Sequence, residues 1–159
     1  PENIGEYLDQ LSNEQEKYIA ILTERIEKQD GLGFLNLMNS AFEEVENICK
    51  PNGSEWFLDI LGFLLNHIPE EAGKVGGICY NGKNAEGKDC VFIKLRRSTK
   101  YDGLDLRQVE VPIKRAFEGH YMGGGGHSGA VSFRVAFHDE KDFFLRLEPV
   151  TDFIKSSIK

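Results

Sequence analysis

The sequence predicts an α/β fold, in which a small mixed β-sheet is flanked by helices and preceded by an N-terminal helical segment. Two observations carry this prediction. Apolar residues recur at helical spacing through residues 13–68, and they alternate with polar residues through 89–97 and 131–138. Further helical patterns lie between and after the two alternating stretches, as expected when strands and helices share one domain.

Two amphipathic helices are predicted near the N-terminus. Ser12 and Gln15 have the spacing of a capping box, which favours a helix over 13–29. A turn signal interrupts the pattern at residues 30–33, and a second apolar stripe predicts another helix over 34–49.

The next elements are a helix and two strands. Ser54 is a favourable N-cap for a third helix, which we expect Pro69 to end. A short strand over 75–80 and a longer one over 89–97 follow, joined by turn residues typical of a hairpin.

The C-terminal third continues the alternation of element types. Residues 100–106 form a polar loop, and a helix is predicted over 109–121. The strand over 131–138 leads to a last helix over 140–157, for which Asp139 is a suitable N-cap.

Composition restricts the class of protein. The 159 residues can bury a sizeable core, and no apolar run approaches the ~20 residues that span a bilayer, so we expect no membrane segment. An odd number of widely spaced cysteines favours free thiols in a reducing compartment, which indicates the cytoplasm. These cysteines are Cys49, Cys79 and Cys90.

Charge is distributed unevenly around the net value of −7. Residues 1–72 carry 15 acidic and 4 basic side chains, whereas residues 73–159 carry 11 acidic and 15 basic ones. We therefore divide the chain into an acidic helical segment, 1–53, and a domain, 54–159, which takes the anionic ligand. The alternative is that the asymmetry reflects only solvated helix faces.

Four glycines at residues 123–126, followed at once by His127, form the most informative motif. Glycine backbone can approach a ligand closely, and successive peptide N–H groups can converge on an anion. The imidazole adds further hydrogen-bonding nitrogens. This pattern favours an anion-binding loop at the mouth of a strand. A flexible linker, a structural turn or a purely structural histidine are the alternatives.

A second candidate group stands where the strand over 89–97 ends. The guanidinium fork of an arginine matches phosphate oxygens, and alternation places Arg96 and Arg97 on opposite faces. We favour Arg97 and Ser98 because they lie at the strand end; a plain surface arginine pair is the alternative.

The segment Gly124-Gly125-Gly126-His127, with Ala130 and a strand after it, resembles the GGGH signature of the DHH-associated domain. That domain is the substrate-binding half of DHH-superfamily phosphoesterases, which include single-strand exonucleases and oligoribonucleases. The Arg97-Ser98 strand end and the element order fit as well, and the resemblance covers roughly residues 54–157.

The resemblance implies a function. Gly124, Gly125, Gly126, His127, Arg97 and Ser98 would bind phosphate groups of single-stranded nucleic acid, a short oligonucleotide or a nucleotide. The catalytic DHH domain of such enzymes holds two metal ions, Mn or Mg, through an Asp-His-His motif that this chain lacks. The chain alone should therefore contain no cofactor and hydrolyse nothing, and the catalytic domain would be its partner.

Two other functions stay open. Alanyl-tRNA synthetases carry a related RNA-binding appendage, so the chain could bind tRNA. Alternatively, the acidic helices over 13–49 could serve as a docking surface or form a homodimer.

Overall fold

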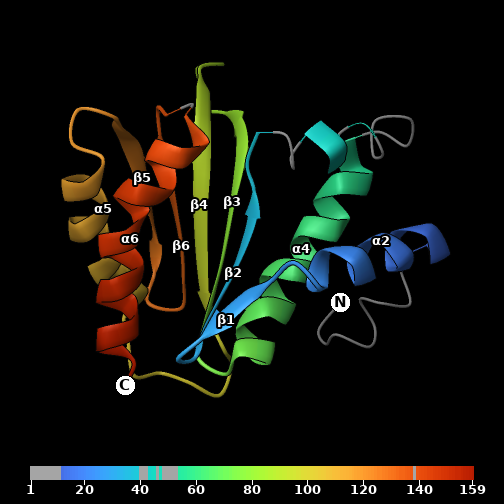
Figure 1. Ribbon diagram of the computed structural model, residues 1–159, viewed down its shortest axis with the longest axis horizontal. Helices are drawn as coiled ribbons and strands as arrows, with labels where there is room; N and C mark the ends of the chain where they lie inside the picture. The colour runs from blue at the N-terminus through green and yellow to red at the C-terminus, as the bar shows by residue number, and fades with distance from the viewer. Residues whose placement is uncertain (1–11, 40–42, 46, 48–53, 138) are drawn as a thin grey trace.

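A six-stranded mixed sheet forms the centre of the protein, with helices on both faces (Figure 1). The computed structural model describes residues 12–39, 43–45, 47, 54–137 and 139–159. In chain order the strands are β1 (Glu27–Gln29), β2 (Leu32–Leu37), β3 (Val75–Lys83), β4 (Asp89–Arg97), β5 (Tyr121–His127) and β6 (Ala130–Val135). Their spatial order is β1-β2-β3-β4-β6-β5. The predicted α/β class, with a helix preceding the sheet, is confirmed.

Strands β2 and β3 are parallel, and all other neighbours are antiparallel. Helix α4 (Ser54–Ala72) lies in sequence between the two parallel strands and packs on β2, β3 and β4. This is the arrangement expected of a parallel pair, which needs a long crossover connection.

The sheet separates two hydrophobic clusters. On the α4 side, Leu35, Leu37 and Ile78 pack with helices α2 (Asn13–Thr23) and α4. On the other side, the apolar residues of β4 and β6, such as Leu95 and Phe133, pack against α5 (Glu110–Ala116) and α6 (Glu140–Ser157). Figure 1 shows α5 and α6 on one face and α4 on the other.

The first predicted helix begins where expected but is shorter. The capping box is confirmed, because the Ser12 hydroxyl accepts from the Gln15 N–H and the Gln15 side chain accepts from the Ser12 N–H. The helix ends at Thr23 instead of residue 29, and β1 occupies 27–29. The Asp-Gly pair at 30 and 31 has φ values of 57° and 88°, the left-handed conformation of a tight hairpin turn.

The second predicted helix, over 34–49, is wrong at its start, because residues 34–37 belong to strand β2. Both faces of this strand carry apolar side chains, including the half-buried Phe34, so the sequence lacks the apolar–polar alternation that would indicate a strand. Residues 43–45 and 47 are helical. The remainder of the predicted segment lies outside the described residues.

Pro69 does not end the third helix, which continues to Ala72. A proline in the last turn removes only one donor, and the chain leaves the helix at Gly73, where φ is 100°. The Gly73 N–H still donates to the Pro69 carbonyl oxygen.

The helix predicted over 109–121 is also shorter. It consists of a 3-10 turn (Leu106–Val109) and α5, and Gly119, with φ of 82°, follows its end. The next residues form β5 and not a loop, so the predicted glycine loop is wrong in its conformation: the four glycines are part of a strand. Glycines have no side chains that could show a strand pattern, and the strand conformation of β5 instead comes from its pairing with β6.

The C-terminal elements agree with the sequence. Strand β6 starts at Ala130 and ends at Val135, and residue 138 of the predicted strand lies outside the described residues. Helix α6 starts after Asp139, whose side chain accepts from the Asp142 N–H. Among the described residues, no helix is both long and apolar enough to span a membrane.

Candidate functional site

The glycine run forms the edge strand of the sheet, and its residues have different reasons to be glycine. Gly123 and Gly126 have φ of 110° and 150°, values that other residues rarely adopt. A Cβ on Gly124 would lie 2.5 Å from the Ser132 carbonyl oxygen, and one on Gly126 would lie 2.1 Å from that of Ala130. A Cβ on Gly125 would meet nothing within 4 Å. The fold therefore requires glycine at three positions and leaves Gly125 open.

The edge position decides what the glycine backbone can bind. In an antiparallel pair, alternate peptide groups point toward the partner strand. The others point away, and β5 has no neighbour on its outer side in the described sheet. The exposed N–H groups of Gly124, Gly125 or Gly126 can thus donate to a ligand only where they point away from β6.

His127 is exposed at the tip of the β5–β6 hairpin. Its Nδ1 atom accepts a hydrogen bond from the Gly129 N–H, at 3.1 Å. A neutral imidazole that accepts through Nδ1 carries its proton on Nε2. The turn therefore fixes the tautomer and leaves the Nε2–H group as the donor that can reach a ligand.

Arg97 lies against the same hairpin tip. Its Nη1 atom donates to the carbonyl oxygens of Leu104 and Asp102, at 2.9 and 3.4 Å, and Nη2 donates to the Ser128 hydroxyl at 3.4 Å. The Arg97 N–H donates to the Gly129 carbonyl oxygen. The guanidinium thus ties the 98–104 loop to the hairpin and keeps part of its donor fork uncommitted.

Gly129 separates the two basic groups. A Cβ at this glycine would lie 3.5 Å from Cε1 of His127 and 3.7 Å from Nε of Arg97. The structure therefore brings together Arg97 and His127, which are thirty positions apart in the sequence. Ser128 and Gly129 hold this arrangement, but they were not predicted as site residues from the sequence. The signal that could have indicated them is their position as a two-residue turn between His127 and Ala130.

Ser98 lies beneath this surface, with only 3% of its area exposed. Its hydroxyl accepts from the Lys100 N–H at 3.2 Å and contacts the Glu70 carboxylate. Burial acts to raise the pKa of Glu70, but the Thr99 N–H and the hydroxyls of Ser98 and Thr99 outweigh it and hold that pKa below its usual value. The observed bonds make Ser98 part of the turn that positions Arg97.

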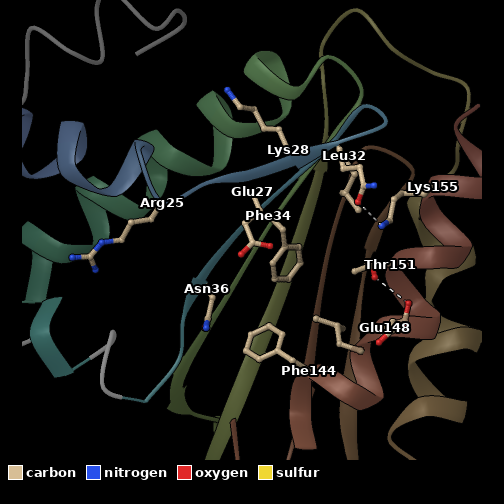
Figure 2. Close-up of a pocket in the computed structure, with 12 residues that line it drawn as sticks. Arg25, Glu27, Lys28, Leu32, Phe34, Asn36, Phe144, Glu148, Thr151 and Lys155 are labelled. Carbon is tan, nitrogen blue, oxygen red and sulfur yellow. Dashed lines mark hydrogen bonds between the residues drawn. The ribbon is translucent and has the colours of Figure 1, made fainter. Parts of the chain in front are cut away.

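The sheet has a separate groove, of about 620 Å³, between β1–β2 and α6. Figure 2 shows Phe34 and Phe144 on its walls, with Glu148, Thr151 and Lys155 in turn along α6. The groove includes none of the predicted site residues. It lies beside the opposite edge of the sheet from β5 and is separate from the hairpin tip.

The described residues contain no cluster of three or more His, Cys, Asp or Glu side chains that could hold a metal ion. The donor set therefore does not fit the two metal ions that the sequence resemblance implies for a catalytic domain.

Comparison with known proteins identifies the fold. No family model matches the sequence, and no curated protein matches it significantly. An exopolyphosphatase-related protein from Bacteroides fragilis superposes with a TM-score of 0.58, at 14% identity and over 94% of this chain. A structure described as the DHH domain of a member of the S1P family of ribosomal proteins gives 0.52, at 18% identity and over 89%.

These likenesses confirm the fold that the resemblance to the DHH-associated domain implies. The chain spans only 37% and 30% of the two solved chains. It therefore has the fold of a part of such proteins.

Proposed function

We propose that this chain is the substrate-binding part of a DHH-type phosphoesterase and that the β5–β6 hairpin tip binds a phosphate group. The observation that carries the proposal is the placement of His127 and Arg97 on either side of Gly129. Two basic side chains beside an exposed strand edge offer charged and neutral donors to one anion. The name of the Bacteroides fragilis protein, which refers to polyphosphate, supports a phosphate-containing ligand.

Each residue has a distinct role in this proposal. His127 donates through Nε2, and the uncommitted part of the Arg97 fork adds positive charge. Outward N–H groups of the Gly124–Gly126 segment complete the donor set, and Ser98 positions the strand end. Catalysis would require metal ions, Mn or Mg, that are held by another part of the enzyme, which is the proposed partner.

The expected ligands are a nucleotide or a short single-stranded oligonucleotide. The chain is acidic overall, with a net charge of −7, so a long duplex would be attracted poorly. Binding would depend on the local basic groups and not on a general positive surface. The natural location that we propose for this activity is the cytoplasm.

Two substitutions of His127 test the proposal. In His127→Asn, the side-chain oxygen can replace Nδ1 as acceptor for the Gly129 N–H, but no group replaces Nε2. In His127→Gln, the longer amide can place an N–H near the Nε2 position. We expect the Asn variant to bind a 5′-mononucleotide about 1–3 kcal/mol more weakly, the range for a hydrogen bond to a charged group, and the Gln variant to recover part of the loss.

Isothermal titration measures these affinities, and thermal unfolding shows whether the variants stay folded. His67→Asn is the matched control, because His67 lies on α4 and pairs with Glu71, away from the hairpin. Unchanged nucleotide affinity in a folded His127→Asn protein would remove His127 from the site. Tighter binding of tRNA than of short oligonucleotides would favour the RNA-binding appendage instead.

A further inference from the structure

The pairing registers place three rows of residues on the α4-side face of β4, β6 and β5. Opposite residues of antiparallel strands share a face, so each row can be followed across the sheet. The rows are Phe92–Arg134–Gly123, Lys94–Ser132–Gly125 and Arg96–Ala130–His127. Tyr80, which belongs to the core under α4, pairs with Phe92 and fixes the side of the sheet. We call these nine residues the basic sheet face.

Small residues make the β6–β5 part of this face shallow. On this face of β6 the small residues Ala130 and Ser132 precede Arg134, and Gly123 and Gly125 of β5 carry no side chains. Gly125 and His127 are exposed, and the other members are partly exposed. Because α4 packs on β2, β3 and β4, it borders the face at β4. A ligand can therefore lie directly on the backbone of β5 and β6.

Among the described residues, no acidic side chain forms an ion pair with the positive side chains of this face. Lys94, Arg96 and Arg134 make no ion pair within the described parts of the chain, although other basic residues do so. Arg96 instead donates to the amide oxygen of Asn66, at 2.7 Å, and Lys94 lies over the rings of Tyr80 and Phe92. These partners are neutral, so they orient the charges without cancelling them.

The pKa of Lys94 agrees with this account. Burial lowers it first, and the neighbouring positive charge of Arg96 lowers it further. Two like charges are thus held close together in an acidic protein. An anion on the face would relieve this repulsion.

We propose that a single-stranded oligonucleotide runs along β6 over the basic sheet face, with successive phosphates near His127 and Arg96, Lys94, and Arg134. This inference rests on the proposed function, because the phosphate at His127 is the first of the series. Adjacent rows are two residues apart along a strand, or about 7 Å, and such a distance suits the consecutive phosphates of an extended nucleic-acid strand. Inorganic polyphosphate has a shorter repeat and would match the rows poorly.

The face therefore selects for ligand length. A mononucleotide would reach only the His127 row, and longer oligonucleotides would gain contacts with Lys94 and Arg134. We expect affinity for 5′-phosphorylated oligodeoxythymidylates to rise from the mononucleotide to the tetranucleotide. The gain should weaken with added salt, since each phosphate contact releases counterions.

Two charge variants test the path. Lys94→Gln and Arg134→Gln should each lower tetranucleotide affinity by about tenfold, the loss expected for one charge-assisted contact. Neither should change mononucleotide affinity. The control is Lys83→Gln, because Lys83 is exposed on β3 and pairs with Asp89. Isothermal titration at two salt concentrations gives both affinity and the salt slope.

Gly125→Val supplies an independent test by blocking the path. The added side chain enters open space and valine favours strands, so the fold should be kept. We expect weaker tetranucleotide binding with little change for the mononucleotide. Thermal unfolding checks that the variant is folded.

The outcomes separate this inference from the proposed function. Two results would overturn the oligonucleotide path but keep the phosphate site at His127. In the first, affinity depends on His127 but does not rise from the mononucleotide to the tetranucleotide. In the second, affinity rises with length but is unchanged in the Lys94→Gln and Arg134→Gln variants. Equal binding of inorganic tripolyphosphate through these two residues would also overturn it. If the unmodified protein bound neither the mononucleotide nor the tetranucleotide, both the proposed function and the oligonucleotide path would be overturned.

Discussion

The Nη1 atom of Arg97 lies 2.9 Å from the carbonyl oxygen of Leu104 and donates a hydrogen bond to it. This bond connects the end of β4 to a loop that follows it, and a weaker contact with Ser128 extends the connection to the β5–β6 hairpin. The arginine is thus a structural tie as well as a candidate phosphate ligand.

The first prediction separates these two roles. In Arg97→Lys, one ammonium group cannot maintain all the contacts of the guanidinium fork. We expect the free energy of unfolding, measured by urea denaturation, to fall by about 1–3 kcal/mol. Arg115→Lys, on the exposed side of α5, should change it by less than about 0.5 kcal/mol. A fully stable Arg97→Lys protein would show that the tie contributes little.

The second prediction concerns the glycine strand. Gly126→Ala should reduce stability by about 1–3 kcal/mol, because alanine at φ of 150° is strained and its Cβ would contact the Ala130 carbonyl oxygen. Gly125→Ala should stay within about 0.5 kcal/mol of the unmodified protein. Equal effects of the two substitutions, measured by thermal unfolding, would contradict the strand geometry.

The third prediction follows from the lowered pKa of Glu70. Its folded-state pKa is below the unfolded value of about 4.3, so the stabilisation is present above that pH and is lost as pH falls through the folded value. We expect Glu70→Gln to be less stable than the unmodified protein at neutral pH, and the difference to shrink below about pH 4.

Urea denaturation across this pH range measures the effect, with Glu118→Gln as an exposed control. A stability difference that stays constant with pH would mean that the Glu70 carboxylate does not carry the contribution.

The fourth prediction concerns the thiols. Burial raises the pKa of both Cys79 and Cys90 and excludes solvent from them. In a Cys49→Ser protein, which removes the cysteine outside the described residues, a thiol-specific reagent should react only on unfolding. Absorbance after mixing, in buffer and in urea, measures this. Rapid labelling of the folded protein would show that one of the two sites opens readily.

The sequence predicted those elements in which the pattern of apolar and polar side chains matches the buried and exposed faces. Strand β4 was readable because Val91, Ile93 and Leu95 face one core and the alternate residues do not. Helix α6 was readable from Asp139 and its apolar stripe. Strand β2 was not, because apolar residues on both of its faces, such as Phe34 and Leu37, fit a helical stripe as well as they fit a strand.

Glycines gave no pattern at all. The strand state of β5 depends on pairing with β6, a tertiary interaction that four residues without side chains cannot signal. The same holds for the candidate site. Its residue types could be chosen from the sequence, but the approach of Arg97 to His127 depends on the pairing of β4 with β6. The binding roles themselves stay predictions.

The parallel pairing of β2 with β3 has a practical consequence for anyone who trims the chain. A version that starts at residue 54 would lack β1 and β2, and β3 would become an exposed edge strand with unpaired backbone groups. Ile78 and its apolar neighbours under α4 would lose the cover that Leu35 and Leu37 provide. Such a shortened protein should self-associate through the exposed edge of β3, so binding assays are best made with the N-terminal strands kept.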